Sequence, residues 1–162
     1  MASGSRFDAL FSRLMKKFDD VQFLGSYRVV DFVVWARALS GKPVRIFSHA
    51  DGEVLANFGE QTPEEAKLGF LDLSGLSPSD ATDKIFAIAE EQSAEADELV
   101  GGGLSRKEAL AKVRQKGRSA FPHEEDVTDL AELWSIDPTE VWDQDNPLAL
   151  GLAARMPKDF AQ

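Results

Sequence analysis

Residues 21–58, VQFLGSYRVVDFVVWARALSGKPVRIFSHADGEVLANF, decide the fold. Their β-branched and aromatic side chains fall into short runs that are separated by turn signals, at residues 40–43 (SGKP) and at Asp51-Gly52. An Asp-Gly pair between two apolar runs is typical of a type I′ hairpin, because both central residues of that turn need a positive φ. The stretch therefore predicts an antiparallel meander of three or four strands.

Helical patterns flank this sheet on both sides. Residues 6–18 place apolar side chains three and four positions apart, which forms one stripe of an amphipathic helix. Over residues 62–145 a capping oxygen stands three positions before a carboxylate at four places, which begin at Thr62, Ser77, Ser105 and Asp137. We expect helices from about residue 78 to 99, at 106–116 and from about residue 122. The three glycines at 101–103 predict a flexible loop over 99–105.

The expected fold is a single α+β domain over residues 1–162, with an N-terminal helix, a sheet and a helical second half. A chain of 162 residues, of which 43% are apolar, is large enough to bury one core without metals or crosslinks. The sequence has no cysteine, which excludes disulfides, thiolate zinc sites and cysteine nucleophiles and favours the cytoplasm.

The composition also disfavours two kinds of partner. No stretch approaches the roughly 18 apolar residues of a membrane span, and the N-terminal residues lack the apolar run of a signal peptide. A net charge of −10 opposes binding to a phosphate backbone, which needs clustered lysine and arginine. We therefore expect binding to neither a membrane nor nucleic acid, and a basic protein as the partner.

No motif typical of catalysis or cofactor binding occurs in the sequence. It contains no Gly-x-Gly-x-x-Gly, no Walker loop and no Gly-x-Ser-x-Gly. His49 lies beside a hairpin turn and His123 at a helix start, and we interpret both as surface groups rather than metal ligands. Carboxylate groupings such as Glu124-Glu125-Asp126 leave a hydrolase as an open alternative. The prediction is a protein without catalytic residues, metal or cofactor.

Charge is unevenly distributed over the second half. Residues 104–118 hold six basic residues and one acidic residue (net +5), whereas residues 121–162 hold ten acidic and two basic residues (net −8). Such runs are either solvated helix faces or docking surfaces, and the basic helix could lie against an acidic neighbour. Trp35 and Trp134 fit a core role, while Trp142, which is surrounded by acids, fits core and interface equally. The partner-binding residues that we predict are Asp126, Asp129, Glu132, Trp142, Asp143 and Asp145.

Two stretches resemble a group of bacterial proteins of mostly uncharacterised activity. Residues 27–70 contain a Trp-Ala-Arg-Ala strand, a glycine turn, a Val-Arg strand and a Gly-Glu-Val hairpin. Residues 121–141, FPHEEDVTDLAELWSIDPTEV, contain a Pro-x-Glu-Glu-Asp-Val helix that ends in Trp-Ser-Ile-Asp-Pro. The resemblance spans about 65 residues and differs around the glycine-rich region 99–119. It implies an immunity protein encoded beside a secreted bacterial toxin, of the type VI secretion type, and it assigns no functional residues.

Three functions follow as hypotheses. The first is a cytoplasmic immunity protein that covers the active site of its cognate toxin; an acidic surface would then complement a basic cleft on that toxin. The second is a chaperone or adaptor that delivers a secreted effector without inhibiting it. The third is a hydrolase that uses the scattered carboxylates.

Overall fold

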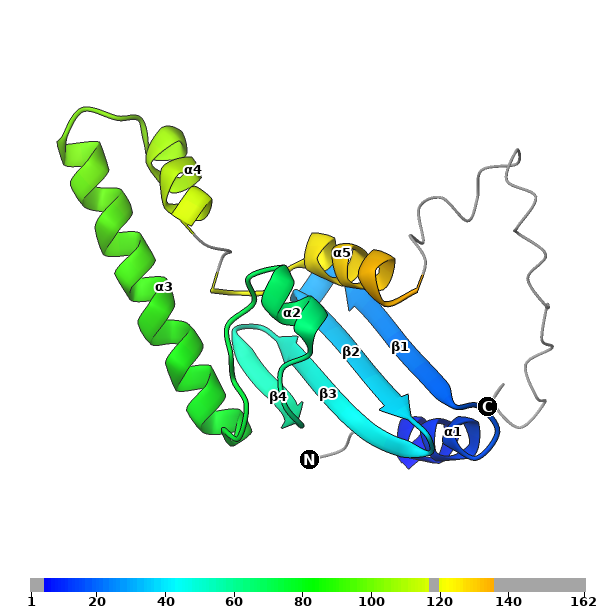
Figure 1. Ribbon diagram of the computed structural model, residues 1–162. Coiled ribbons are helices and arrows are strands. Elements are labelled where there is room, and N and C mark those ends of the chain that lie inside the picture. Colours follow the sequence, from blue (N-terminus) through cyan, green and yellow to red (C-terminus); the bar gives the residue numbers. More distant parts are fainter. Residues whose placement is uncertain (1–4, 117–119, 136–162) are drawn as a thin grey trace, which may run out of the picture.

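The computed structural model describes residues 5–116 and 120–135, and its centre is a four-stranded antiparallel sheet (Figure 1). The strands lie in the order in which they occur in the chain: β1 (Asp20–Tyr27), β2 (Phe32–Leu39), β3 (Lys42–Ala50) and β4 (Glu53–Phe58). In the turn between β3 and β4, Asp51 and Gly52 have φ of 49° and 84°, as a type I′ turn requires. The predicted meander is confirmed, with four strands and a start one residue earlier than expected.

Five α-helices and one short 3₁₀ helix complete the described chain, so the α+β class is confirmed. They are α1 (Ser5–Met15), η1 (Arg28–Val30), α2 (Pro63–Lys67), α3 (Pro78–Gly101), α4 (Arg106–Lys116) and α5 (Glu124–Trp134). The helix predicted over 6–18 ends earlier, because the Lys17 and Phe18 N–H groups both donate to the Leu14 carbonyl and close the last turn. Phe18 is consequently exposed. The helix start predicted at Asp137 lies outside the described residues.

The sheet separates two apolar clusters. On one face, Trp35 and Phe47 pack with side chains of α5 and α3. The ring centroids of Trp35 and Phe47 are 4.4 Å apart. On the other face, Phe11 of α1 packs against Ala36 and Ala38. Trp134 is buried in the first cluster, so both tryptophans that were expected in the core are there. Figure 1 shows α2 and α5 side by side over the same face.

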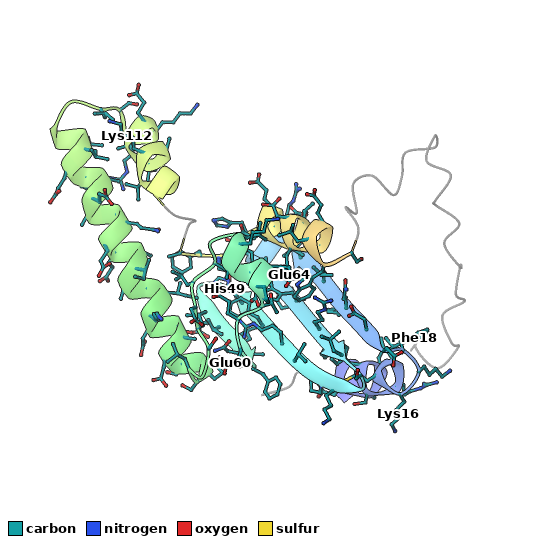
Figure 2. The ribbon with its side chains drawn as sticks, viewed as in Figure 1. Lys16, Phe18, His49, Glu60, Glu64 and Lys112 are labelled. Carbon is teal, nitrogen blue, oxygen red and sulfur yellow. The ribbon has the colours of Figure 1, made fainter. Side chains whose placement is uncertain are left out.

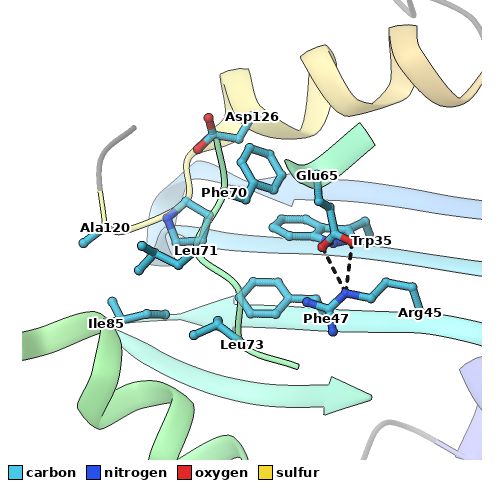
Figure 3. A pocket seen from close by; sticks show the side chains of 11 residues that line it. Trp35, Arg45, Phe47, Glu65, Phe70, Leu71, Leu73, Ile85, Ala120 and Asp126 are labelled. Carbon is cyan, nitrogen blue, oxygen red and sulfur yellow. Dashed lines mark hydrogen bonds and ion pairs between the residues drawn. The ribbon is translucent and has the colours of Figure 1, made fainter. Parts of the chain in front are cut away.

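A buried ion pair fixes α2 to the sheet (Figure 3). Arg45 of β3 and Glu65 of α2 are 2% and 1% exposed, and Arg45 Nε donates to Glu65 Oε1 at 2.9 Å. Glu65 also accepts from Trp35 Nε1 at 2.8 Å and from the Thr62 N–H at 2.7 Å, while Arg45 Nη1 donates to Asn57 Oδ1 at 2.8 Å. Beside this network lies a cavity of about 30 Å³, which has room for about one water. The charges are therefore both paired and hydrogen-bonded, as burial demands.

Helices α3 and α4 form a hairpin that projects away from the sheet (Figure 1). The first half of α3 packs against β4, where Thr82 Oγ1 accepts from the Val54 N–H at 2.9 Å. The second half carries α4, which buries Ala109 against Ala96, and an Arg106–Asp97 ion pair joins the two helices. The basic helix thus lies against an acidic neighbour. Lys112 on α4 lies far from the sheet (Figure 2).

The connection between α3 and α4 lies within residues 99–105, where a flexible loop is predicted. Helix α3 extends two residues further than expected, and a closed turn follows it. The Gly103 N–H donates to the Val100 carbonyl and the Leu104 N–H to the Leu99 carbonyl, with Gly103 at a φ of 100°. These are the two bonds of a Schellman motif, and Leu104 and Leu99 both pack against the cluster that contains Ala96 and Ala109. The glycines therefore end a helix in a defined turn.

Candidate functional site

A surface cleft of about 550 Å³ lies where the β1–β2 connection meets the start of α5. We call it the α5 cleft. It is lined by Ser26, Arg28, Asp31, Phe32, Val33, Pro122, His123, Glu124 and Glu125. Its two walls are thus about 95 residues apart in sequence, and the packing of α5 on β1 and β2 brings them together.

The β1–β2 connection makes contacts to two neighbouring elements. Asp31 ends η1 with a φ of 44°, a left-handed conformation that costs a residue other than glycine roughly 1 kcal/mol or more. The Asp51 N–H donates to the Val30 carbonyl at 3.1 Å and ties the connection to the β3–β4 turn. On the other side, Arg28 Nε donates to Glu124 of α5. A backbone hydrogen bond to the β3–β4 turn and an exposed ion pair to α5 therefore connect this short segment to two neighbouring elements.

Large side chains of the same connection point into solvent. Val29 is 76% exposed, the largest value among the exposed large hydrophobic residues of the described chain, and Tyr27 is 58% exposed. The side chain of Arg28, between them, is 83% exposed. We call Tyr27, Arg28 and Val29 the η1 tip. Tyrosine and arginine are enriched in the residues that dominate binding energy at interfaces, so a tip of this composition is suited to contact a protein.

The opposite wall of the cleft is the first turn of α5. Glu124 accepts from Ser26 Oγ at 3.2 Å and from Arg28 Nε. The hydrogen bond from Arg28 is the main cause that lowers the pKa of Glu124, so this carboxylate stays ionised at neutral pH. The cleft contains three carboxylates, of Asp31, Glu124 and Glu125, and one guanidinium. With His123 counted as neutral, the lining of the cleft has a formal charge of −2, which suits a cationic group.

Asp126 caps the same helix. The His123 N–H donates to Asp126 Oδ2 at 2.6 Å, and the Asp126 side chain is buried. Its carboxylate therefore compensates the helix N-terminus from within the protein, as in a capping box. The prediction that Asp126 contacts a partner does not fit this burial.

His49 lies inside the protein (Figure 2), so our interpretation of it as a surface group is wrong. The ring is 2% exposed, and among the described residues neither ring nitrogen has a partner in good hydrogen-bond geometry, although the Asp31 backbone lies close enough to favour the protonated form. The ring centroid of Phe121 is 5.8 Å away. Desolvation is the main cause that lowers the pKa of His49, and His123 lowers it further. His49 is thus a neutral core residue, whereas His123 is exposed as predicted.

The residues that line the cleft limit what it could hold. Within residues 5–116 and 120–135, no three histidine or carboxylate side chains converge in a way that could hold a metal ion. None of the helices described there is long and apolar enough to cross a membrane. The cleft presents carboxylate acceptors together with apolar side chains. Comparisons with family models, curated proteins and solved structures gave no match. The resemblance to toxin-associated immunity proteins therefore stays a prediction.

The predicted partner-binding residues have different positions. Glu132 is exposed on α5, Asp129 is half-buried on the same helix, and Trp142, Asp143 and Asp145 lie outside the described residues. Sequence reasoning missed the η1 tip and Asp31. The available signal was Asp31 itself, a polar residue with a tolerance for left-handed backbone inside an otherwise apolar run.

Proposed function

We propose that this protein binds a cognate bacterial toxin and neutralises it by covering its active site, with the η1 tip and the α5 cleft as the contact surface. The observation that carries the proposal is the exposure of Val29 and Tyr27 beside an acidic cleft. Large exposed side chains of this kind are suited to contact another protein.

The position of the cleft supports the same proposal. Residues 27–70 and 121–141 are the two stretches that resemble toxin-associated immunity proteins, and they supply both walls of the cleft apart from Ser26. A family of binding proteins would be expected to share the elements that build its binding surface.

Neutralisation by this surface needs no reaction. An apolar tip that enters the active site of a toxin excludes substrate, and a net charge of −10 steers the protein toward a toxin whose cleft is basic. The proposal includes action in the cytoplasm, which a sequence without cysteine favours.

The test is co-expression with the toxin gene that neighbours this one, together with purification of the complex. Tyr27→Ala combined with Val29→Asp should lower affinity by at least about tenfold, which is about 1.4 kcal/mol, and should lose protection of the cells. The control is Phe18→Ala, since Phe18 is 57% exposed, like Tyr27, but follows α1, away from the cleft (Figure 2). It should bind and protect like the unchanged protein.

Other outcomes select other functions. Tight binding without rescue from toxicity would refute neutralisation, and a bound toxin that keeps its activity would select the chaperone or adaptor. Equal affinity of the tip variant and the Phe18 control would remove the η1 tip from the interface. Hydrolysis that is lost in Glu124→Ala, with folding intact, would favour an enzyme.

A further inference from the structure

The α5 cleft carries the features that a long basic side chain would need. Its lining combines three apolar residues, Phe32, Val33 and Pro122, with three carboxylates. Lysine and arginine have an apolar stem and a charged end. The stem can lie along Phe32 and Pro122 while the charged end reaches the carboxylates.

Charge favours a cation over an anion in this cleft. Helix N-termini commonly attract anions, because their first N–H groups lack partners. In α5 the protein's own carboxylates already occupy the first turn, and Asp126 accepts from the His123 N–H. The formal charge of −2 in the cleft would repel a phosphate or a carboxylate.

One cation already lies at the cleft. Arg28 donates to Glu124, yet the Arg28 side chain is 83% exposed and that of Glu124 is 40% exposed. An exposed pair of this kind contributes little stability, so another cation can replace Arg28 at low cost. Glu124 then keeps the hydrogen bond from Ser26.

The apolar residues of the η1 tip and the cleft are neighbours in the chain. Val29 directly follows Arg28, which both belongs to the tip and lines the cleft. A partner that covers Val29 would therefore bring its adjacent side chains to the cleft. We infer that the partner surface is an apolar socket flanked by a lysine or arginine, whose side chain enters the α5 cleft and takes the place of Arg28 at Glu124. This inference rests on the proposed function for the existence of a protein partner.

The experiment is an NMR titration of the full-length ¹⁵N-labelled protein with the peptide acetyl-Leu-Arg-Leu-amide. We expect amide shifts at Ser26, Asp31 and Glu125. The same peptide with citrulline, a neutral analogue, in place of arginine should cause none of them. Glu124→Gln should weaken binding of the arginine peptide about two- to fivefold, because it removes the charge of an exposed group and keeps an acceptor.

A matched variant serves as the control. Asp20 is also 40% exposed and also pairs with an arginine, Arg37, but it lies outside the cleft. Asp20→Asn should therefore leave the peptide affinity unchanged. Arg28→Ala should tighten peptide binding, because it removes the internal competitor for Glu124. The amide spectra show in each case whether the variant is folded.

The inference is overturned if the arginine peptide causes no shifts in the cleft, if the citrulline peptide binds equally well, or if Arg28→Ala weakens binding. None of these results involves the toxin, so each would leave neutralisation open to its own test. Conversely, specific binding of the arginine peptide without protection of cells would overturn the proposed function. The α5 cleft would then still be a binding site for a lysine or arginine side chain.

Discussion

Replacing Glu65 with alanine should be among the most destabilising single changes in the described chain. Glu65 accepts from Arg45, from the Trp35 indole and from the Thr62 N–H, and both charged side chains are almost fully buried. Removal of one partner from such a pair leaves an uncompensated buried charge, which costs about 3–5 kcal/mol. With about 2–4 °C per kcal/mol for a chain of this size, the melting temperature should fall by roughly 6–20 °C.

The measurement is urea unfolding followed by tryptophan fluorescence, since Trp35 is itself part of the network. The control is Glu64→Ala, one residue earlier on the same helix, where the carboxylate is 29% exposed and lies 3.7 Å from Arg37. A half-buried pair whose charged atoms lie 3.7 Å apart contributes roughly 1 kcal/mol or less, so Glu64→Ala should lose much less stability than Glu65→Ala.

A double variant separates the ion pair from general damage to the core. Arg45→Met combined with Glu65→Leu removes both charges together and should recover much of the stability that Glu65→Ala loses. Two results would show that the buried pair does not hold α2 on the sheet. One is a loss of unfolding free energy in Glu65→Ala no larger than in Glu64→Ala. The other is a loss in the double variant larger than the losses in Arg45→Met and Glu65→Leu added together.

Further predictions concern pH and backbone. The pKa of His49 is lowered from 6.5 in the folded state, so the unfolded chain binds a proton first and the free energy of unfolding should fall as pH drops below about 6.5. In His49→Phe the free energy of unfolding should change much less between about pH 7 and pH 5, as urea unfolding at several pH values would show. Gly59→Ala should destabilise far more than Gly75→Ala in thermal unfolding. Both glycines have positive φ, but only at Gly59 would a Cβ lie 2.0 Å from an oxygen, that of Val44.

Local chemistry explains what the sequence could predict. The hairpin at Asp51-Gly52 and the capped helix starts at Thr62 and Ser77 depend on residues within four positions of one another, and the structure contains all three. The α5 cleft could not be found in this way. The hydrogen bond from Ser26 to Glu124 joins residues 98 positions apart, and nothing near either residue indicates the other.

The sequence also did not predict that two polar residues, His49 and Asp126, are buried. The reason is again a contact between residues far apart in sequence. His49 stands beside a turn and Asp126 in a first helical turn, positions where side chains are usually exposed. Both are buried by elements that arrive from elsewhere: Phe121 lies close to His49, and Asp126 lines the inner cavity together with Trp35 and Phe70. Propensity and patterning describe a residue's own neighbourhood in sequence and carry no information about such contacts.

The buried network and the cleft are mechanically connected. Helix α2, which the Arg45–Glu65 pair holds on the sheet, contacts α5, and the first turn of α5 is one wall of the cleft. A change at Glu65 can therefore displace Glu124 without touching a partner. A loss of partner binding in Glu65→Ala would consequently be no reason to place Glu65 in the interface. Only variants that bind less while they unfold normally, as expected for the η1 tip and Glu124, can locate the binding surface.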